Sequence, residues 1–139
     1  MNQNSNTGDL FERLRDGALT DVIYCVDPFP PLPVYLAKLC EERGGAREPI
    51  IQKAGIERSY GHQLFNGLRN PSRDKAIQLA FGFELNAEQA QELLRAATVG
   101  QLNPRIRRDA VIIYCLMHKI DLLETQRMLK HFGLTPLGG

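Results

Sequence analysis

The chain has 139 residues, which is enough for one domain with a hydrophobic core and too few for two independent ones. Its composition is that of a globular protein, with 43% hydrophobic and 24% charged residues, and a net charge of +1 excludes conclusions about partners from overall charge. Cys25, Cys40 and Cys115 are too far apart for a CxxC metal pair and suggest no disulfide framework, so a reducing compartment is expected.

No membrane segment and no catalytic motif is visible in the sequence. The N-terminus lacks the basic and apolar regions of a signal peptide, and no apolar run reaches the roughly 18 residues of a membrane span. His62, His118 and His131 show no ligand spacing, and no catalytic triad, carboxylate pair or Gly-rich phosphate loop is present. We therefore expect a cytoplasmic protein that is not an enzyme, holds no metal or cofactor and does not bind a membrane.

Charged residues are distributed in blocks along the chain. Residues 1–42 carry three basic and seven acidic side chains, whereas residues 43–75 carry seven basic and three acidic ones. Residues 104–119 form a second basic block with four basic side chains and one acidic one. Local basic blocks of this kind are typical of a surface that binds a polyanion, and a solvated face is the alternative interpretation.

The first 33 residues are expected to form an N-terminal extension. Residues 9–16 predict a short amphipathic helix, with Leu10, Phe11 and Leu14 on one face. The stretch TDVIYCV, residues 20–26, fits a strand and a helical turn equally well. The stretch DPFPPLP, residues 27–33, predicts a stiff, extended connector, because proline fixes φ and removes hydrogen-bond donors.

Helical patterns dominate from residue 34 onward. Glycines follow several of the patterns, Ser72, Asn86 and Asp121 are N-cap candidates, and Pro104 is expected to open a helix. The expected fold is therefore all-α, with helices over residues 34–43, 47–54, 58–66, 74–83, 86–97, 104–118 and 121–132. Val34, Tyr114, Met117 and Phe132 are among the apolar residues assigned to the inward faces of these helices.

The second half of the chain repeats one pattern at an offset of 35 residues. RDKAIQLAFGFELNAEQAQELLR, residues 73–95, aligns with RDAVIIYCLMHKIDLLETQRMLK, residues 108–130. Arg73-Asp74 falls on Arg108-Asp109, and Asn86 falls on Asp121. The sequence therefore predicts two copies of one helical hairpin. Because two copies are too few for a solenoid, we expect the second hairpin to complete the core of the first.

Residues 47–66 predict a helix-turn-helix unit with its turn at Gly55 and Ile56. Ile50, Ala54, Ile56 and Leu64 would face the core, and Ile51 would need a pocket in a partner helix. Gly61 indicates close contact between the two helices, or close approach of a ligand. The solvent-facing side of the second helix would carry residue types that contact base edges and phosphates. These residues are Arg58, Ser59, His62, Gln63 and Asn66.

The stretch YLAKLCEERGGAREPIIQKAGIERSYGHQLFNGLRNPSRDKAIQLAFGF resembles the XRE-type, lambda-repressor-like helix-turn-helix domain. With the later NPRIRRDAVIIYCL, it resembles a subgroup of small bacterial proteins that have a further C-terminal helical hairpin. The resemblance implies a five-helix core over residues 34–97 and a hairpin over residues 98–139 packed on the same core. It also implies a regulator of transcription that binds double-stranded DNA.

The resemblance divides the site residues into two sets. Arg58, Ser59, His62, Gln63 and Asn66 would read bases, and the phosphates would be held by Arg47, Tyr60, Arg69, Arg73 and Lys75. For Tyr60 a half-buried ring in the core is the alternative, and for Arg73 a local pair with Asp74. Arg105, Arg107 and Arg108 form a second basic cluster that would extend the DNA footprint or bind an acidic partner.

A second interpretation belongs to another class of protein. The same surface, or the second hairpin, would bind a protein partner, and the chain would be a helical adaptor without DNA-binding activity. The weak net charge and an acidic residue, Glu57, at the position where the family commonly has a Ser or Thr cap favour this alternative. If DNA is the partner, a homodimer on a palindromic site is an option.

Overall fold

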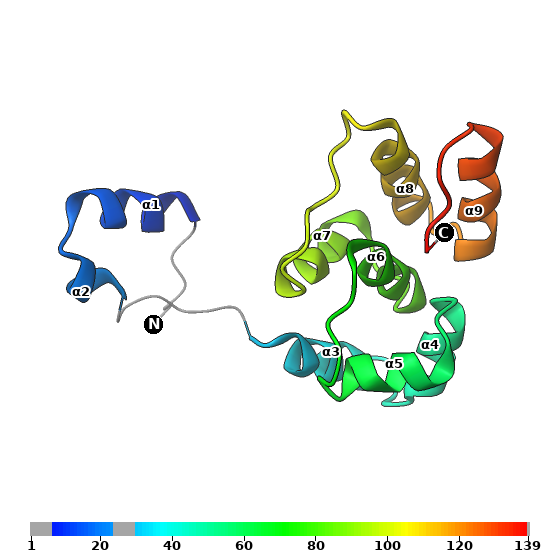
Figure 1. Cartoon of the computed structure of the whole chain (residues 1–139), viewed down its shortest axis with the longest axis horizontal. Coiled ribbons are helices and arrows are strands. Elements are labelled where there is room, and N and C mark those ends of the chain that lie inside the picture. Colours follow the sequence, from blue (N-terminus) through cyan, green and yellow to red (C-terminus); the bar gives the residue numbers. More distant parts are fainter. Residues whose placement is uncertain (1–6, 24–29, 139) are drawn as a thin grey trace.

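The computed structural model describes residues 7–23 and 30–138, and this part of the chain is all-helical, as expected (Figure 1). Within these ranges there are nine helices and no strand: α1 Thr7–Asp16, α2 Leu19–Ile23, α3 Leu32–Glu41, α4 Arg47–Lys53, α5 Arg58–Phe65, α6 Arg73–Gly82, α7 Ala87–Ala96, α8 Arg107–Met117 and α9 Leu122–His131.

Helices α3 to α9 form one body around α6. Every residue of α6 from Ala76 to Gly82 is buried, because α4, α7 and α9 all pack against this helix. The buried residues of α3, α4, α8 and α9 belong to the same hydrophobic cluster as those of α6, for example Leu36, Ile50, Ile112 and Leu129. The core therefore runs without a break from the first half of this body to the last hairpin.

Helices α1 and α2 lie apart from this body, on the side of α3 that is remote from α8 and α9 (Figure 1). The helix predicted over residues 9–16 is confirmed by α1, and α2 shows that the start of residues 20–26 is helical. The rest of that stretch, with Cys25, and residues 27–29 of the connector lie outside the described residues. Most large apolar side chains of α1 and α2 are exposed: Phe11, Leu14, Leu19 and Ile23.

The start of α3 differs from the prediction. The extended connector was expected to continue to residue 33, but α3 already begins at Leu32, with Pro31 at its N-cap. Proline is tolerated in the first turn of a helix, because its missing N–H would have no intrahelical partner there. Leu32 is buried as a result, and Val34, which was expected in the core, is 57% exposed.

The predicted N-caps are confirmed, but the start of α8 is not where it was expected. Ser72, Asn86 and Asp121 each accept a hydrogen bond from a backbone N–H in the first turn of the following helix. Pro104, by contrast, lies in a turn, and α8 begins three residues later at Arg107. The prediction that three residues of the last hairpin lie in the core is also wrong. The structure shows that these residues are exposed: Tyr114, Met117 and Phe132.

The two hairpins exchange ion pairs between equivalent residues. Arg73 donates to Asp109 with an Nη2–Oδ2 distance of 2.7 Å, and Arg108 donates to Asp74 with an Nη2–Oδ2 distance of 2.9 Å. The alternative in which Arg73 pairs with its neighbour Asp74 is therefore wrong. Each Arg-Asp dipeptide instead binds the copy 35 residues away, which relates the two hairpins by an approximate two-fold axis.

The same symmetry extends to the segments that follow α7 and α9. Arg73 donates to the carbonyls of Gly100 and Gln101, and Arg108 donates to those of Thr135 and Pro136. Two glutamines act in the same way: Gln91 exchanges two hydrogen bonds with the backbone of Leu102, and Gln126 does so with that of Leu137. These contacts hold residues 100–103 in an irregular conformation, which explains why α8 starts after Pro104.

Candidate nucleic-acid interface

The turn between α4 and α5 is built from residues with separate roles. Gly55 has a φ of 65°, a conformation that favours glycine, and Ile56 is buried in the core. Gln78 in α6 holds the turn in place, because its Nε2 donates a hydrogen bond to the carbonyl of Ala54 over 3.0 Å. The expected inward positions Ile50, Ala54, Ile56 and Leu64 are all buried.

Glu57 is the N-cap of α5. Its carboxylate accepts from the backbone N–H groups of Ser59 and Tyr60, at 3.0 and 2.8 Å. These hydrogen bonds lower the pKa of the Glu57 carboxyl, the one from Tyr60 contributing most. The acid is therefore occupied by the helix itself, and it fills the place where α5 would otherwise offer N–H groups to a phosphate.

Glu48 links two of the predicted base-reading residues. Its Oε1 accepts from Arg58 Nε at 2.8 Å and lies 3.0 Å from His62 Nε2. These two contacts hold the pKa of the Glu48 carboxyl below its usual range, with the His62 contact contributing most. The pair is exposed, with 78% of the Arg58 side chain and 52% of the Glu48 side chain accessible to solvent.

The remaining predicted residues of α5 are also connected to basic side chains. Gln63 Oε1 accepts from Arg69 Nε at 2.8 Å, and the Arg69 guanidinium lies 5.9 Å from the centre of the Tyr60 ring. At the C-terminal end of α5, the C-cap residue Asn66 accepts through Oδ1 from Arg47 Nη1 at 2.8 Å. Tyr60 is half-buried, which fits the ring packing expected for it.

The structure thus brings together most, but not all, of the predicted site. The exposed side of α5 with its two flanking arginines, called the α5 face below, consists of Arg47, Arg58, Ser59, Tyr60, His62, Gln63, Asn66 and Arg69. Sequence reasoning missed Glu48, which lies on this face as the counterion of Arg58 and His62. Spacing along one helix gives no signal for it, because the contact joins α4 to α5.

Three predicted basic residues are engaged elsewhere. Arg73 and Arg108 are committed to the crossed ion pairs and to the backbone carbonyls of the segments after α7 and α9. Lys75 lines a hollow between the α4–α5 turn and α9, together with Gln78 and Gly138. Arg105 and Arg107 are exposed at the start of α8, where neither forms an ion pair within the described residues.

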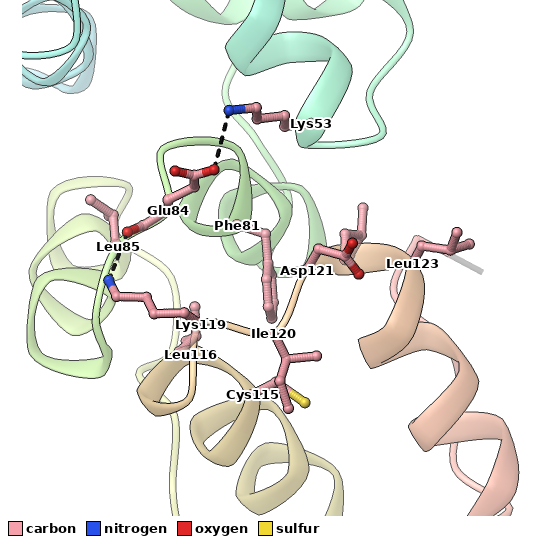
Figure 2. Close-up of a pocket in the computed structure, with 11 residues that line it drawn as sticks. Lys53, Phe81, Glu84, Leu85, Cys115, Leu116, Lys119, Ile120, Asp121 and Leu123 are labelled. Carbon is pink, nitrogen blue, oxygen red and sulfur yellow. Dashed lines mark hydrogen bonds and ion pairs between the residues drawn. The ribbon is translucent and has the colours of Figure 1, made fainter.

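A separate hollow of about 540 Å³ lies where α6, α8 and α9 meet (Figure 2). It lies at the seam of the repeat, because its walls include the equivalent pairs Phe81 and Leu116, and Leu85 and Ile120. Lys53 Nζ is 3.1 Å from Glu84 Oε1, and Lys119 Nζ donates to the Glu84 carbonyl over 3.0 Å (Figure 2).

The chemistry of this hollow is mainly apolar. Burial raises the pKa of the Cys115 thiol in its wall, which disfavours the nucleophilic thiolate. In the part of the chain that the structure describes, no group of His, Cys, Asp and Glu residues is arranged to hold a metal ion. The α5 face is accordingly the surface with the greater concentration of ligand-binding side chains.

No family model, no curated protein and no solved structure matches this chain. Among the described residues, no helix is long and apolar enough to cross a membrane.

Proposed function

We propose that this protein binds double-stranded DNA through a helix-turn-helix of the lambda-repressor type, with α5 in the major groove, and that it acts as a bacterial regulator of transcription. The observation that carries the proposal is the α5 face. Along one side of a single helix it offers Arg58, His62, Gln63 and Asn66, which are residue types that bond to base edges. Arg47 and Arg69 flank this side at its two edges, where phosphates border the groove.

The ion pairs on the α5 face are compatible with this role. Exposed ion pairs contribute about 0–1 kcal/mol each, so a phosphate or a base can replace Glu48 as the partner of Arg58 at little cost. Within the proposal, Glu48 lowers the affinity for DNA of any sequence, unless it accepts from a cytosine amino group. Such a contact would favour particular sites over random sequence.

The structure narrows the set of residues proposed to hold phosphates. Arg47, Arg69 and the Tyr60 hydroxyl remain in the set, since they lie around α5. Arg73 is left out because its guanidinium already bonds to Asp109, Gly100 and Gln101, and Arg108 is left out for the equivalent reason. Lys75 is left out because it lines the hollow beside α9.

Binding to mixed duplex fragments over a salt series tests the proposal. The logarithm of the binding constant should fall linearly with the logarithm of salt concentration, by about 0.9 per phosphate contacted. The double variant Arg58→Ala, Arg69→Ala should bind much more weakly, whereas Arg127→Ala is a matched control, because Arg127 is an exposed arginine on α9 that pairs locally with Glu124. Absence of binding at low salt would overturn the proposal.

The alternative function is that of a helical adaptor for a protein partner. One observation favours it: the exposed side of α8 carries Ile106, Tyr114 and Met117, which are 51%, 49% and 63% accessible to solvent. Large apolar side chains that share one exposed helix face are typical of a surface that is covered by another helix.

A further inference from the structure

The exposed side of α8 is a continuous apolar stripe. It comprises the exposed residues Ile106, at the N-cap, Tyr114 and Met117, together with Ala110 and Ile113, which share their face at helical spacing but are half-buried, Ile113 against the core. The opposite side of α8 is the one that enters the core, through Ile112, Cys115 and Leu116. We call the exposed side the α8 stripe.

The internal repeat shows what kind of element covers such a stripe. The residues of the first hairpin that are equivalent to Ile106, Ile113, Tyr114 and Met117 are all buried: Pro71, Gln78, Leu79 and Gly82. In that hairpin the cover is α4. Gln78 donates to the Ala54 carbonyl, and a methyl group added at Gly82 would lie 2.5 Å from the Ile50 carbonyl oxygen. On α8, therefore, the positions equivalent to Leu79 and Gly82 are exposed, as Tyr114 and Met117, whereas Ile113 is half-buried against the core.

The substitutions between the two faces define what would fit on α8. Ile113 stands in place of Gln78, and Met117 stands in place of Gly82. Gln78, which bonds to the carbonyl at the C-terminal end of α4, is thus replaced on α8 by the apolar side chain of Ile113. A helix on α8 cannot approach as closely as α4 approaches α6, because a glycine contact has become a methionine contact. The α8 stripe consequently suits a helix with large apolar side chains.

Helix α1 has the apolar pattern that this surface requires. Leu10, Phe11 and Leu14 repeat the spacing of Ile50 and Ile51 in α4 and Ala54 at its C-cap, with larger side chains at two of the positions. Phe11 is 70% exposed and Leu14 is 47% exposed, whereas Leu10 is half-buried, so most of this face of α1 is uncovered within the described structure. The second half of the segment, α2, adds the exposed residues Leu19 and Ile23.

The charges of the two surfaces are complementary. Residues 7–23 carry four acidic and two basic side chains, and one of the acids, Asp16, pairs with its neighbour Arg15. Beside the α8 stripe, Arg105 and Arg107 are exposed and take part in no ion pair with any described residue. Docking of α1 on α8 would therefore bury apolar side chains on both elements and bring acidic groups to two arginines that have no acidic partner.

The arrangement of the chain favours exchange between two molecules. The α1–α2 segment lies beyond α3, whereas α8 lies on the other side of the body (Figure 1). We propose that the α1–α2 segment of one copy packs on the α8 stripe of a second copy, and that the reciprocal contact closes a two-fold symmetric homodimer. This dimer does not depend on DNA binding, because neither surface includes the α5 face.

Oligomeric state provides the first test. The full-length chain should sediment as a dimer at micromolar concentration, and Leu14→Asp and Met117→Asp should each raise the dimer dissociation constant at least tenfold. Leu68→Asp is the matched control, since Leu68 is 74% exposed in the turn after α5 and should leave the dimer intact. Circular dichroism and thermal melting of each variant check that it is folded. A monomer at all concentrations, or a dimer that Leu14→Asp does not weaken, would overturn the proposal.

A disulfide experiment identifies the occupant of the stripe. In a Cys25→Ser background, Cys40 and Cys115 remain as buried thiols. Mixing the variant Leu14→Cys with the variant Met117→Cys should give a covalent heterodimer under mild oxidation. If Met117→Cys instead links only to itself, α8 packs on α8. A chain that carries both substitutions is tested separately: if it forms a link within itself while the mixture gives no heterodimer, the segment folds back on its own body. Either result would refute the exchange.

Discussion

Ile51 of α4 fills the space that a side chain at Gly61 of α5 would need. A methyl group added at Gly61 would lie 2.6 Å from Ile51 Cγ2 and 2.9 Å from Ile51 Cδ1. Ile51 is only 2% exposed, so this contact is the pocket that the isoleucine was expected to require. Glycine inside a helix costs about 1 kcal/mol relative to alanine, and burial of an isoleucine contributes about 1.5–3 kcal/mol. The pair therefore stabilises the packing of α4 against α5 in spite of the poor helix propensity of Gly61.

Replacing Gly61 with alanine should destabilise the protein. We expect a loss of about 1–3 kcal/mol in the free energy of unfolding, because overpacking at the α4–α5 contact outweighs the gain in helix propensity. Urea denaturation measures the loss. Ser59→Ala, an exposed change in the same helix, should be nearly neutral. The double variant Gly61→Ala, Ile51→Ala removes all three Ile51 atoms that a methyl group at Gly61 would meet, so it should cost less than the sum of the two single changes. Additive losses would mean that the glycine acts through another contact.

The elements that were predicted correctly are those that depend on neighbours along the chain. Asn86 and Asp121 were identifiable as caps because a cap contacts a backbone N–H only three residues later. The start of α8 was not identifiable, because the segment around Gly100 is fixed by Arg73 from another helix. Met117 continues the apolar spacing of α8, and whether another helix covers it depends on contacts between helices, so its exposure was not predictable either.

The same distinction applies to the candidate site. Helical spacing predicted that Arg58, His62 and Gln63 share one side of α5, where the structure leaves Arg58 exposed and His62 and Gln63 half-buried. The role of Glu48 as their counterion and the engagement of Arg73 with Asp109 are contacts between helices. Local sequence suggested the neighbour Asp74 for Arg73, and only the three-dimensional arrangement of the two hairpins excludes it.

Removal of the Glu48 charge should strengthen binding to DNA of mixed sequence. Glu48→Gln keeps the shape of the side chain and frees Arg58 and His62 from a carboxylate that also repels phosphate. We expect a gain of about threefold to tenfold in affinity at low salt, measured by fluorescence anisotropy, as for the loss of one exposed unfavourable charge. Glu88→Gln, an exposed acid in the first turn of α7, is the control that should leave affinity unchanged. Weaker binding by Glu48→Gln would show that Glu48 contacts the DNA favourably.

Gln63 and Arg69 should have separable effects on DNA binding, although they bond to each other over 2.8 Å. Gln63→Ala should reduce the discrimination between a selected site and random duplex by about 1–3 kcal/mol, if Gln63 makes a bidentate contact with a base. Arg69→Ala should weaken binding to all sequences alike and reduce the salt slope by about one. Equal losses on specific and random duplex for both variants would mean that α5 does not lie in the groove.

Acid should destabilise the protein partly through Asp74. The Arg108 guanidinium holds the pKa of the Asp74 carboxyl below its usual range, and the backbone N–H of Gly138 acts in the same direction. Because the pKa is lower in the folded state, the stabilisation is complete above the unfolded-state pKa and is lost as pH falls through the folded-state pKa. The melting temperature of Asp74→Asn should therefore fall less steeply than that of the wild type below about pH 4. Parallel curves for the two proteins would contradict this assignment.

The crossed ion pairs should differ in strength according to burial. The Asp109 side chain is 2% exposed, whereas that of Asp74 is 28% exposed. Asp109 accepts two hydrogen bonds from Arg73 and one from the backbone of Asn103, so its replacement by alanine leaves a half-buried guanidinium without its counterion. We expect Asp109→Ala to cost about 3–5 kcal/mol in urea denaturation, which approaches the total stability of a small domain.

The equivalent change in the other pair provides the comparison. Asp74→Ala should cost less than Asp109→Ala, because the Asp74 carboxylate is 28% exposed and its ion pair is partly screened by solvent, whereas the Asp109 carboxylate is 2% exposed. A double-mutant cycle between Arg73 and Asp109 should give a coupling energy of at least about 1 kcal/mol. A cycle between Arg73 and Asp74, which are adjacent in sequence but belong to different pairs, should give a much smaller value. If the Arg73–Asp74 coupling were the larger of the two, the hairpins would not exchange ion pairs in solution, and the two-fold relation between them would lose its main energetic support.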